Sequence, residues 1–306
     1  MASLFSWDAG EKFMRPSPFQ LEAAHVSFSA AWFFPLALVV VIMASAIFRL
    51  TSKQRAFDKK SELLAAAPVV AASPTVRPRH MAVIMDGNRR YGREKHGVPT
   101  KGHWDGGNTL IDFVKWCISA RIPAVTVYAF SSENWSRPQH EIDVLMQIFV
   151  RYCDRIEDES RKNGIQVRFI STSPQLFKPK VLERFRRVEE ASKHCSNLVL
   201  NVCVSYGARE ELALACQHIA ERVNCGEMTC DQITPDEISK SLLTSHVPDP
   251  DLVLRTSGEQ RLSNFLLFQA AYAEFVFVDK YWPALTREDF DEVLDEFARR
   301  KRRFGK

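Results

Sequence analysis

The sequence predicts an α/β fold: a doubly wound, mostly parallel six-stranded sheet with flanking helices, preceded by one N-terminal transmembrane helix. From about residue 80 onward, short apolar runs alternate with amphipathic stretches, and this alternation is typical of parallel sheets covered on both faces. The predicted strands are 81–85, 124–130, 165–171, 198–204, 251–255 and 274–278. The predicted helices are 105–120, 140–163, 178–195, 207–224, 234–244 and 286–302.

Local signals support the helices. Apolar residues between 142 and 149 recur at the spacing of one helix face. Thr234 is a preferred N-cap, and Pro235 and two acids follow it in the first turn of the predicted helix. In sheets of this kind a ligand binds beyond the carboxyl ends of the strands. Ligand-binding groups are therefore expected in the segments that follow the predicted strands.

The composition is that of a mostly globular protein, with 306 residues, 46% of them hydrophobic and 25% charged. The net charge of +4 suits an anionic ligand or a membrane surface. Nucleic acid is not a predicted partner, because no basic run is interleaved with aromatic residues. The seven cysteines are scattered without a CxxC pair. We expect reduced, structural thiols and no zinc site, which favours a cytosolic domain.

The first quarter of the chain is predicted to attach the protein to a membrane. Residues 1–25 are expected to be flexible, residues 26–48 are an uncharged, mainly apolar run, and residues 49–79 form a basic, Ala/Pro-rich linker. A helix over 26–48 would span about 34 Å, enough to cross a bilayer. A core helix or a cleaved signal peptide explains this run less well. The basic residues that follow it place the folded region, 80–306, in the cytosol.

The stretch HMAVIMDGNRRYG, residues 80–92, carries the strongest chemical signal. Its apolar run ends in Asp-Gly-Asn-Arg-Arg, residues 86–90. A carboxylate there can hold a divalent metal, the turn exposes backbone N–H groups, and the arginines neutralise phosphate. The pattern predicts a metal-assisted polyphosphate site, and an ordinary Asp-Gly turn is the alternative.

Two further segments follow predicted strands and carry polar groups. Residues 131–137, SSENWSR, supply hydrogen-bonding groups, an aromatic ring and a guanidinium, although a helix-capping loop is an alternative there. Residues 255–263 place Arg255 and Arg261 around a glycine turn, and Arg binds phosphate bidentately. Glu274 opens the last strand and is either a second metal-binding acid or a solvated strand-edge residue. The Walker motif and a catalytic Cys/His or Ser/His arrangement are absent, so diphosphate chemistry is favoured.

Together the three segments resemble the cis-prenyltransferases, over about residues 80–306. This family includes the bacterial undecaprenyl diphosphate synthases and the eukaryotic dehydrodolichyl diphosphate synthases. The resemblance implies a doubly wound fold with a hydrophobic tunnel. The implied reaction is Mg²⁺-dependent: isopentenyl diphosphate is condensed repeatedly onto farnesyl diphosphate to give a long-chain polyprenyl diphosphate, such as the dolichol precursor.

The resemblance also implies roles for single residues. Asp86 resembles the catalytic residue that holds Mg²⁺, and Glu274 resembles a second metal-binding acid. Asn134 resembles an asparagine implicated in proton removal, although an amide is a poor base and a positioning role is the alternative. The implied substrate-binding residues are Gly87, Asn88, Arg89, Arg90, Tyr91, His103, Ser131, Ser132, Glu133, Trp135, Arg137, Arg255, Arg261, Leu262, Ser263, Arg303 and Gly305.

Three positions depart from the pattern of many family members. Tyr91 stands where many members have Trp, and Arg89 replaces the glycine of many bacterial members. Pro99 stands where bacterial members often carry a basic residue, so either Lys101 makes that contact or it is lost.

The C-terminal Arg303-Phe304-Gly305 resembles the RxG motif that reaches the partner's active site in homodimeric members. Because one chain carries both this motif and Asp86, we expect a self-sufficient homodimer. The resemblance implies a single-pass protein of the endoplasmic reticulum membrane. A non-catalytic accessory subunit of a heteromeric enzyme is the alternative. Such a subunit would be expected to lack the metal-binding acid and the arginine cradle.

Overall fold

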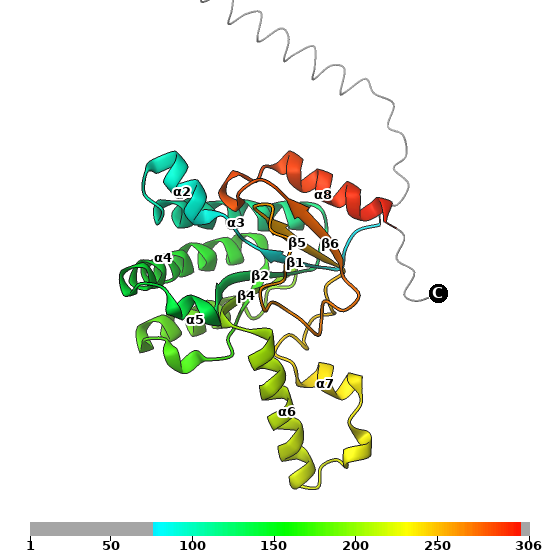
Figure 1. Cartoon of the computed structure of the whole chain (residues 1–306). Helices are drawn as coiled ribbons and strands as arrows, with labels where there is room; N and C mark the ends of the chain where they lie inside the picture. The colour runs from blue at the N-terminus through cyan, green and yellow to red at the C-terminus, as the bar shows by residue number, and fades with distance from the viewer. Residues whose placement is uncertain (1–75, 301–306) are drawn as a thin grey trace, which may run out of the picture. The chain divides into compact units, whose positions relative to one another are not determined.

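A six-stranded parallel sheet organises residues 76–300, the part of the chain that the computed structural model describes (Figure 1). Its order is β3-β4-β2-β1-β5-β6, and every neighbouring pair is parallel. The strands are β1 (His80–Ile84), β2 (Ala124–Ser131), β3 (Ile165–Ile170), β4 (Leu198–Tyr206), β5 (Leu252–Thr256) and β6 (Glu274–Val278). All six predicted strands are therefore confirmed.

The helices of the described region are α2 (Asn88–His96), α3 (Lys101–Ser119), α4 (Gln139–Asn163), α5 (Pro179–Ser192), α6 (Ala208–Asn224), α7 (Pro235–Ser241) and α8 (Arg287–Arg299). Helix α2 was not among the predicted helices. Its only buried residue is Gly92, so it lacks the apolar periodicity on which the prediction depends. Glycines in left-handed conformation bound it on both sides, at Gly87 and Gly97.

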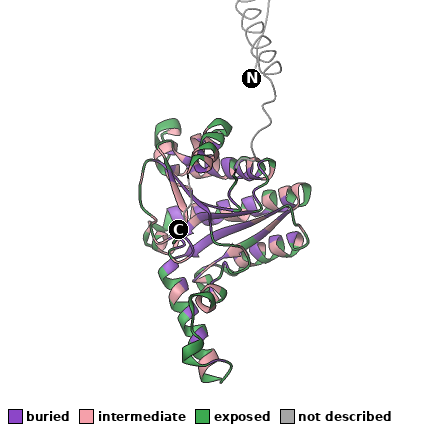
Figure 2. Ribbon diagram, turned by 90° about the vertical axis from the view of Figure 1, so that its right-hand side faces the viewer, coloured by how far each residue is buried: buried purple, intermediate pink, exposed green. Residues whose placement is uncertain are grey.

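The two faces of the sheet are covered differently. Helices α3, α4, α5 and α8 cover one face (Figure 1), around a large core that includes Phe113 and Trp282. The other face has a smaller core, in which Phe265 and Leu266 come from the segment after β5. Helix α6 was predicted to flank the sheet, but it extends away from it together with α7 (Figure 2). Its apolar face is incomplete, since Leu214 is 41% exposed.

The strand order places a crevice at the carboxyl edge of the sheet. From β1 the chain moves to β2 on one side, and it later returns to β5 on the other side of β1. In open parallel sheets, ligands bind at such a reversal of strand order, beyond the carboxyl ends. Asp86 follows β1 and Arg255 lies in β5, so both predicted site residues lie at this crevice.

The predicted N-terminal segments lie outside the described residues. The predicted transmembrane helix, 26–48, is not described, nor is most of the linker that follows it. Within residues 76–300, no helix is both long enough and apolar enough to cross a bilayer.

A buried hydrogen-bonded chain lies at the opposite, amino edge of the sheet. His80 is 1% exposed, with Nδ1 2.6 Å from the Pro248 carbonyl and Nε2 2.7 Å from Thr126 Oγ1. Because the carbonyl can only accept, Nδ1 carries the proton and Nε2 accepts from the hydroxyl. Thr126 Oγ1 in turn accepts from Asn201 Nδ2 at 3.1 Å. Burial lowers the pKa of His80 from 6.5 to about 4, so the ring is neutral in the folded protein at neutral pH.

This depressed pKa predicts acid sensitivity. The unfolded chain takes up a proton at His80 near pH 6.5, whereas the folded protein does so only near pH 4. The free energy of unfolding should therefore fall by up to about 3 kcal/mol between these pH values. Urea unfolding of the wild type and of His80→Gln, which does not titrate, checks this. A variant with the same slope of unfolding free energy against pH as the wild type would contradict the assignment.

Candidate active site

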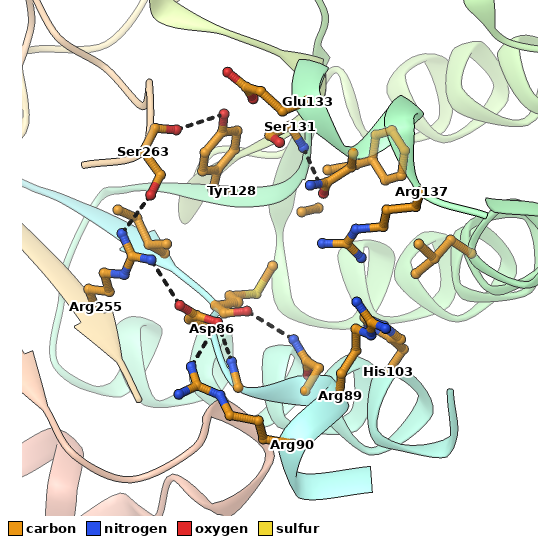
Figure 3. Close-up of a pocket in the computed structure, with 18 of the residues that line it drawn as sticks. Asp86, Arg89, Arg90, His103, Tyr128, Ser131, Glu133, Arg137, Arg255 and Ser263 are labelled. Atoms are coloured by element: carbon orange, nitrogen blue, oxygen red, sulfur yellow. Dashed lines mark hydrogen bonds and ion pairs between the residues drawn. The ribbon is translucent and has the colours of Figure 1, made fainter. Parts of the chain in front are cut away.

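A polar pocket of about 780 Å³ opens at the carboxyl edge of the sheet (Figure 3). The ends of β1, β2 and β5, the start of α2 and the turn after β5 form its walls. Six arginines line it, together with Asp86 and Glu133. The predicted site residues that line it are Asp86, Gly87, Asn88, Arg89, Arg90, His103, Ser131, Glu133, Asn134, Arg137, Arg255, Arg261 and Ser263. The sequence motifs thus converge on one pocket.

The backbone of Asp86 is fixed from two neighbouring segments. The Thr256 hydroxyl accepts from Asp86 N at 3.0 Å and donates to Asp86 O at 2.8 Å, and Trp282 N donates to the same carbonyl at 2.9 Å. Gly87 follows with φ +94°, and a Cβ there would lie 2.7 Å from the Tyr281 ring. Only glycine fits this turn without strain. The turn directs the Asp86 side chain into the pocket and starts α2, whose free N–H groups favour an anion.

The Asp86 carboxylate lies between two guanidinium groups. Arg255 Nη2 donates to Oδ2 at 2.9 Å, Arg90 Nη2 lies 3.4 Å from Oδ1, and Gly87 N donates to Oδ1 at 2.6 Å. Burial alone would raise the pKa of Asp86, but the hydrogen bonds from Arg255 and Gly87 and the nearby positive charges bring it below the ordinary value. The carboxylate is therefore ionised at neutral pH. Such an oxygen ligand suits Mg²⁺.

Arg255 joins Asp86 to the turn after β5. Its side chain is 4% exposed, and Nη1 donates to Ser263 Oγ at 2.9 Å and also to the Arg261 carbonyl. Tyr128 OH lies 3.0 Å from the Tyr206 carbonyl and 3.3 Å from the Ser263 carbonyl, so its one hydrogen is shared between them. Ser263 has φ +50°, a conformation that a serine keeps only when its surroundings impose it. The turn is therefore held in a fixed position relative to Asp86.

A second cationic group lies on the other side of the pocket, where Figure 3 shows Arg89, Arg137 and His103 together. Arg137 and Arg89 share the buried carboxylate of Glu141, at 3.0 and 3.4 Å. One acid for two guanidinium groups leaves net positive charge for an anion. Burial, together with repulsion from Arg137 and Arg89, lowers the pKa of His103 to about 4. Its Nε2 is buried and has no hydrogen-bond partner among the described residues, so a neutral ring is available to a ligand.

The 131–137 loop presents Asn134 to the pocket but turns Trp135 away from it. Asn134 Oδ1 accepts from Ser131 N at 3.2 Å, so the side-chain oxygen is already in use. Trp135 Nε1 donates to Ser205 Oγ at 2.8 Å, and its ring packs against Phe130 and Phe177. The indole supports the loop from inside the fold.

An apolar cavity of about 90 Å³ adjoins the polar pocket. Asn88, His103 and Leu145 line both spaces. Beyond them the cavity runs between α3 and α4, and its walls include Ile148 and Phe169. The site therefore combines a cationic pocket with an apolar extension, which suits a ligand with an anionic head and a hydrocarbon tail.

Seven predicted site residues are not part of this pocket. Tyr91, Ser132, Trp135 and Leu262 do not line it, so the structure does not support direct contact for them there. Arg303 and Gly305 lie outside the described residues. Glu274 begins β6 at the amino edge of the sheet, where its backbone N donates to the Asp251 carbonyl. Its carboxylate accepts from Arg300 Nη1 at 3.0 Å.

Within one chain, Glu274 and Asp86 therefore lie at opposite edges of the sheet. In a parallel sheet, the first residue of a strand lies at the opposite edge from the last. The register β5–β6 pairs Glu274 with Leu252, and β1–β5 pairs Leu252 with Met81, at the start of β1. The described residues contain no group of three or more His, Cys, Asp or Glu side chains that could hold a metal. Asp86 would therefore share the ion with ligand oxygens, a common arrangement for Mg²⁺.

Sequence reasoning missed two residues that shape the site. Glu141 lies four positions after Arg137 on α4, so its helical spacing could have indicated the pair. Asn264 carried no local signal, because its partner Glu133 lies 131 positions away in the sequence. Thr256 lies in the 255–263 segment that was predicted to bind phosphate, but its hydroxyl holds the backbone of Asp86.

Comparisons with known proteins agree with this geometry. Residues 84–305 match the protein family described as "Putative undecaprenyl diphosphate synthase". The chain belongs to this family of cis-prenyltransferases. It is therefore a transferase of prenyl groups, and the observed sheet with its flanking helices is the family's fold.

The matches to named relatives cover most of this chain and nearly the full length of each relative. The isoprenyl transferase of Thermotoga maritima is 40% identical over 229 residues, which are 74% of this chain and 97% of the relative. The undecaprenyl diphosphate synthase of Micrococcus luteus, named as specific for (2E,6E)-farnesyl diphosphate, is 38% identical over 74% of this chain and 91% of its own.

A solved structure extends the comparison to a plant enzyme. Lavandulyl diphosphate synthase from Lavandula x intermedia, in complex with dimethylallyl diphosphate, superposes with a TM-score of 0.72 at 29% identity. The match covers 75% of this chain and 99% of that one. Its name differs from those of the bacterial relatives, so this fold alone does not specify the product.

Proposed function

We propose that this enzyme condenses isopentenyl diphosphate repeatedly onto farnesyl diphosphate and releases a long-chain polyprenyl diphosphate, with Mg²⁺ as cofactor. The observation that carries the proposal is the ionised Asp86 in an arginine-lined pocket that continues into an apolar cavity. The name of the Micrococcus luteus relative supports the choice of farnesyl diphosphate. A non-catalytic accessory role is disfavoured because both the acid and the arginine cradle are in place.

Two different groups of residues bind the two diphosphates. The start of α2, with Arg89 and Arg90, binds the allylic diphosphate, and Arg255 and Ser263 bind the isopentenyl diphosphate. Bound Mg²⁺ would be held by Asp86 and would neutralise charge on the leaving diphosphate. Asn134 positions a diphosphate or water through its NH₂ group, because its oxygen is occupied by Ser131 N. A donor of this kind cannot remove a proton.

The apolar cavity supports a hydrophobic tunnel between α3 and α4. The cavity is apolar and small, about 90 Å³. A long polyprenyl chain needs more apolar space, so we expect α3 and α4 to move apart as the product grows. A membrane anchor at 26–48 in the endoplasmic reticulum, with the catalytic domain in the cytosol, would place such a product beside the lipid that receives it.

The proposal predicts metal-dependent activity of the purified full chain. Incubation with farnesyl diphosphate and labelled isopentenyl diphosphate should transfer label to extractable polyprenyl products, whose length is then measured. Excess chelator should stop incorporation, because the leaving diphosphate loses its counter-ion, and added Mg²⁺ should restore it. Incorporation that persists unchanged in chelator would contradict the metal assignment. No incorporation without a second protein would favour a heteromeric enzyme.

A further inference from the structure

Asn264 connects three segments at the rim of the pocket, and no predicted role accounts for it. Its backbone carbonyl accepts from Ala208 N at 2.8 Å, and its Oδ1 accepts from Arg209 N at 2.9 Å. Its Nδ2 donates to Glu133 Oε1 at 3.1 Å and to Glu210 Oε2 at 3.0 Å. The side chain thus uses both of its amide hydrogens and its oxygen. Glu133 belongs to the loop after β2, and Glu210 belongs to α6.

The first role of Asn264 is to cap α6. The N-cap residue of α6 is Gly207, which has no side chain, so another segment has to satisfy the first N–H groups. Asn264 does this with two oxygens, in a left-handed backbone conformation of φ +62°. A Cβ at Gly207 would lie 2.6 Å from Asn264 Nδ2. A larger residue at 207 would therefore require the side chains of Asn264 and Glu210 to shift.

The second role is to hold the Glu133 loop to the turn after β5. Asn264 directly follows Ser263, whose hydroxyl accepts from Arg255. Glu133 lies in the same loop as Asn134 and Arg137, and all three line the pocket. Glu133 and Glu210 are each within 3.1 Å of one nitrogen. Since no ion pair of either acid is found among the described residues, the amide is the group that brings the two carboxylates together.

We propose that Asn264 is a positioning residue that sets the spacing between the 131–137 loop and the 261–264 turn, and thereby shapes the half-site for the second, isopentenyl diphosphate substrate. The proposal rests on the proposed function for the identity of that substrate. Its physical basis is that a donor between two acids draws their two segments together, whereas an acceptor at the same place drives them apart. Asn264 itself contacts the loop and the helix and takes no part in the chemical step.

The substitution Asn264→Asp separates the two roles. Aspartate keeps the oxygen that caps α6 and suits a helix N-terminus, but it cannot donate to Glu133 or Glu210. The KM for isopentenyl diphosphate should rise about tenfold, because charge-assisted hydrogen bonds at the rim are lost. The KM for farnesyl diphosphate should change less than about twofold, and thermal unfolding should stay close to that of the wild type.

Two double variants show which carboxylate, that of Glu133 or that of Glu210, determines the KM for isopentenyl diphosphate. In E133Q/N264D the new glutamine amide can donate to the new carboxylate, so the KM for isopentenyl diphosphate should return toward the wild-type value. In the matched control E210Q/N264D the donor is restored on the α6 side instead, and the KM should stay high. Both double variants are measured by steady-state kinetics of the full-length protein in detergent, with each substrate varied in turn.

Three outcomes would overturn this role. They are an unchanged KM for isopentenyl diphosphate in Asn264→Asp, a parallel rise in both KM values with a lower unfolding temperature, and better rescue by E210Q than by E133Q. The last two would reduce Asn264 to a cap of α6. A wild-type protein that is inactive on both substrates would instead overturn the proposed function, so the two failures are distinguishable.

Discussion

Replacing Asp86 with asparagine should lower the turnover number by about a thousandfold while the protein remains folded. The amide keeps an oxygen that can accept from Arg255, whose guanidinium is 4% exposed. It lacks the negative charge that, on the proposed function, would hold a divalent metal beside the diphosphate. The loss should therefore fall on the chemical step, and added Mg²⁺ should rescue it only weakly.

The variant Asp86→Ala should differ from Asp86→Asn in the stability of the folded protein. Asp86→Ala removes the partner of a buried guanidinium, which is costly, so it should combine the same loss of turnover with a lower unfolding temperature. A surface acid provides the control: Asp154 is 58% exposed and pairs with Arg184, and Asp154→Asn should keep wild-type turnover. Initial rates over a range of Mg²⁺ concentrations test all three. Near-normal turnover in Asp86→Asn would contradict the metal-holding role.

The strands were predictable from the sequence because each is a short apolar run ended by a polar turn. Once the strands were predicted to be parallel, Asp86 and Arg255 were expected to lie close together, because the carboxyl ends of parallel strands share one edge of the sheet. The helix α2 was not predictable by apolar spacing, because it is polar and its start depends on the left-handed Gly87. It begins directly after the Asp86-Gly87 turn, which the sequence did indicate.

Two features depend on contacts between distant segments. Glu274 begins β6, and the strand direction places it at the amino edge, paired with Arg300. Helix α6 has enough apolar residues to be predicted as a flanking helix, but it extends away from the sheet, and its start is held by Asn264 and by the bond from Tyr206 OH to Glu211. Neither result can be derived from local pattern, because each depends on which segments become neighbours after folding.

The contacts of Arg300 fix the position of the last described residue before the C-terminal tail. Arg300, the last described residue, lies at the amino edge of the sheet, where it also donates to the Phe275 carbonyl at 2.8 Å. The pocket lies at the carboxyl edge of the same sheet. Arg300 therefore lies on the side of the sheet away from the pocket of its own chain. That Arg303 and Gly305, which lie outside the described residues, serve the pocket of a second copy stays a prediction.

A mixed-dimer experiment tests that prediction directly. A chain truncated after Arg302 lacks the tail, and an Asp86→Asn chain lacks a working pocket, so each should be nearly inactive alone. When the two are co-expressed, random pairing should recover about one quarter of wild-type activity, since half the dimers are mixed and each has one intact site. Co-expression of Asp86→Asn with Arg255→Ala, two pocket variants, should recover none. A tail that serves its own pocket gives no recovery in either mixture, because no chain then carries both an intact pocket and its tail.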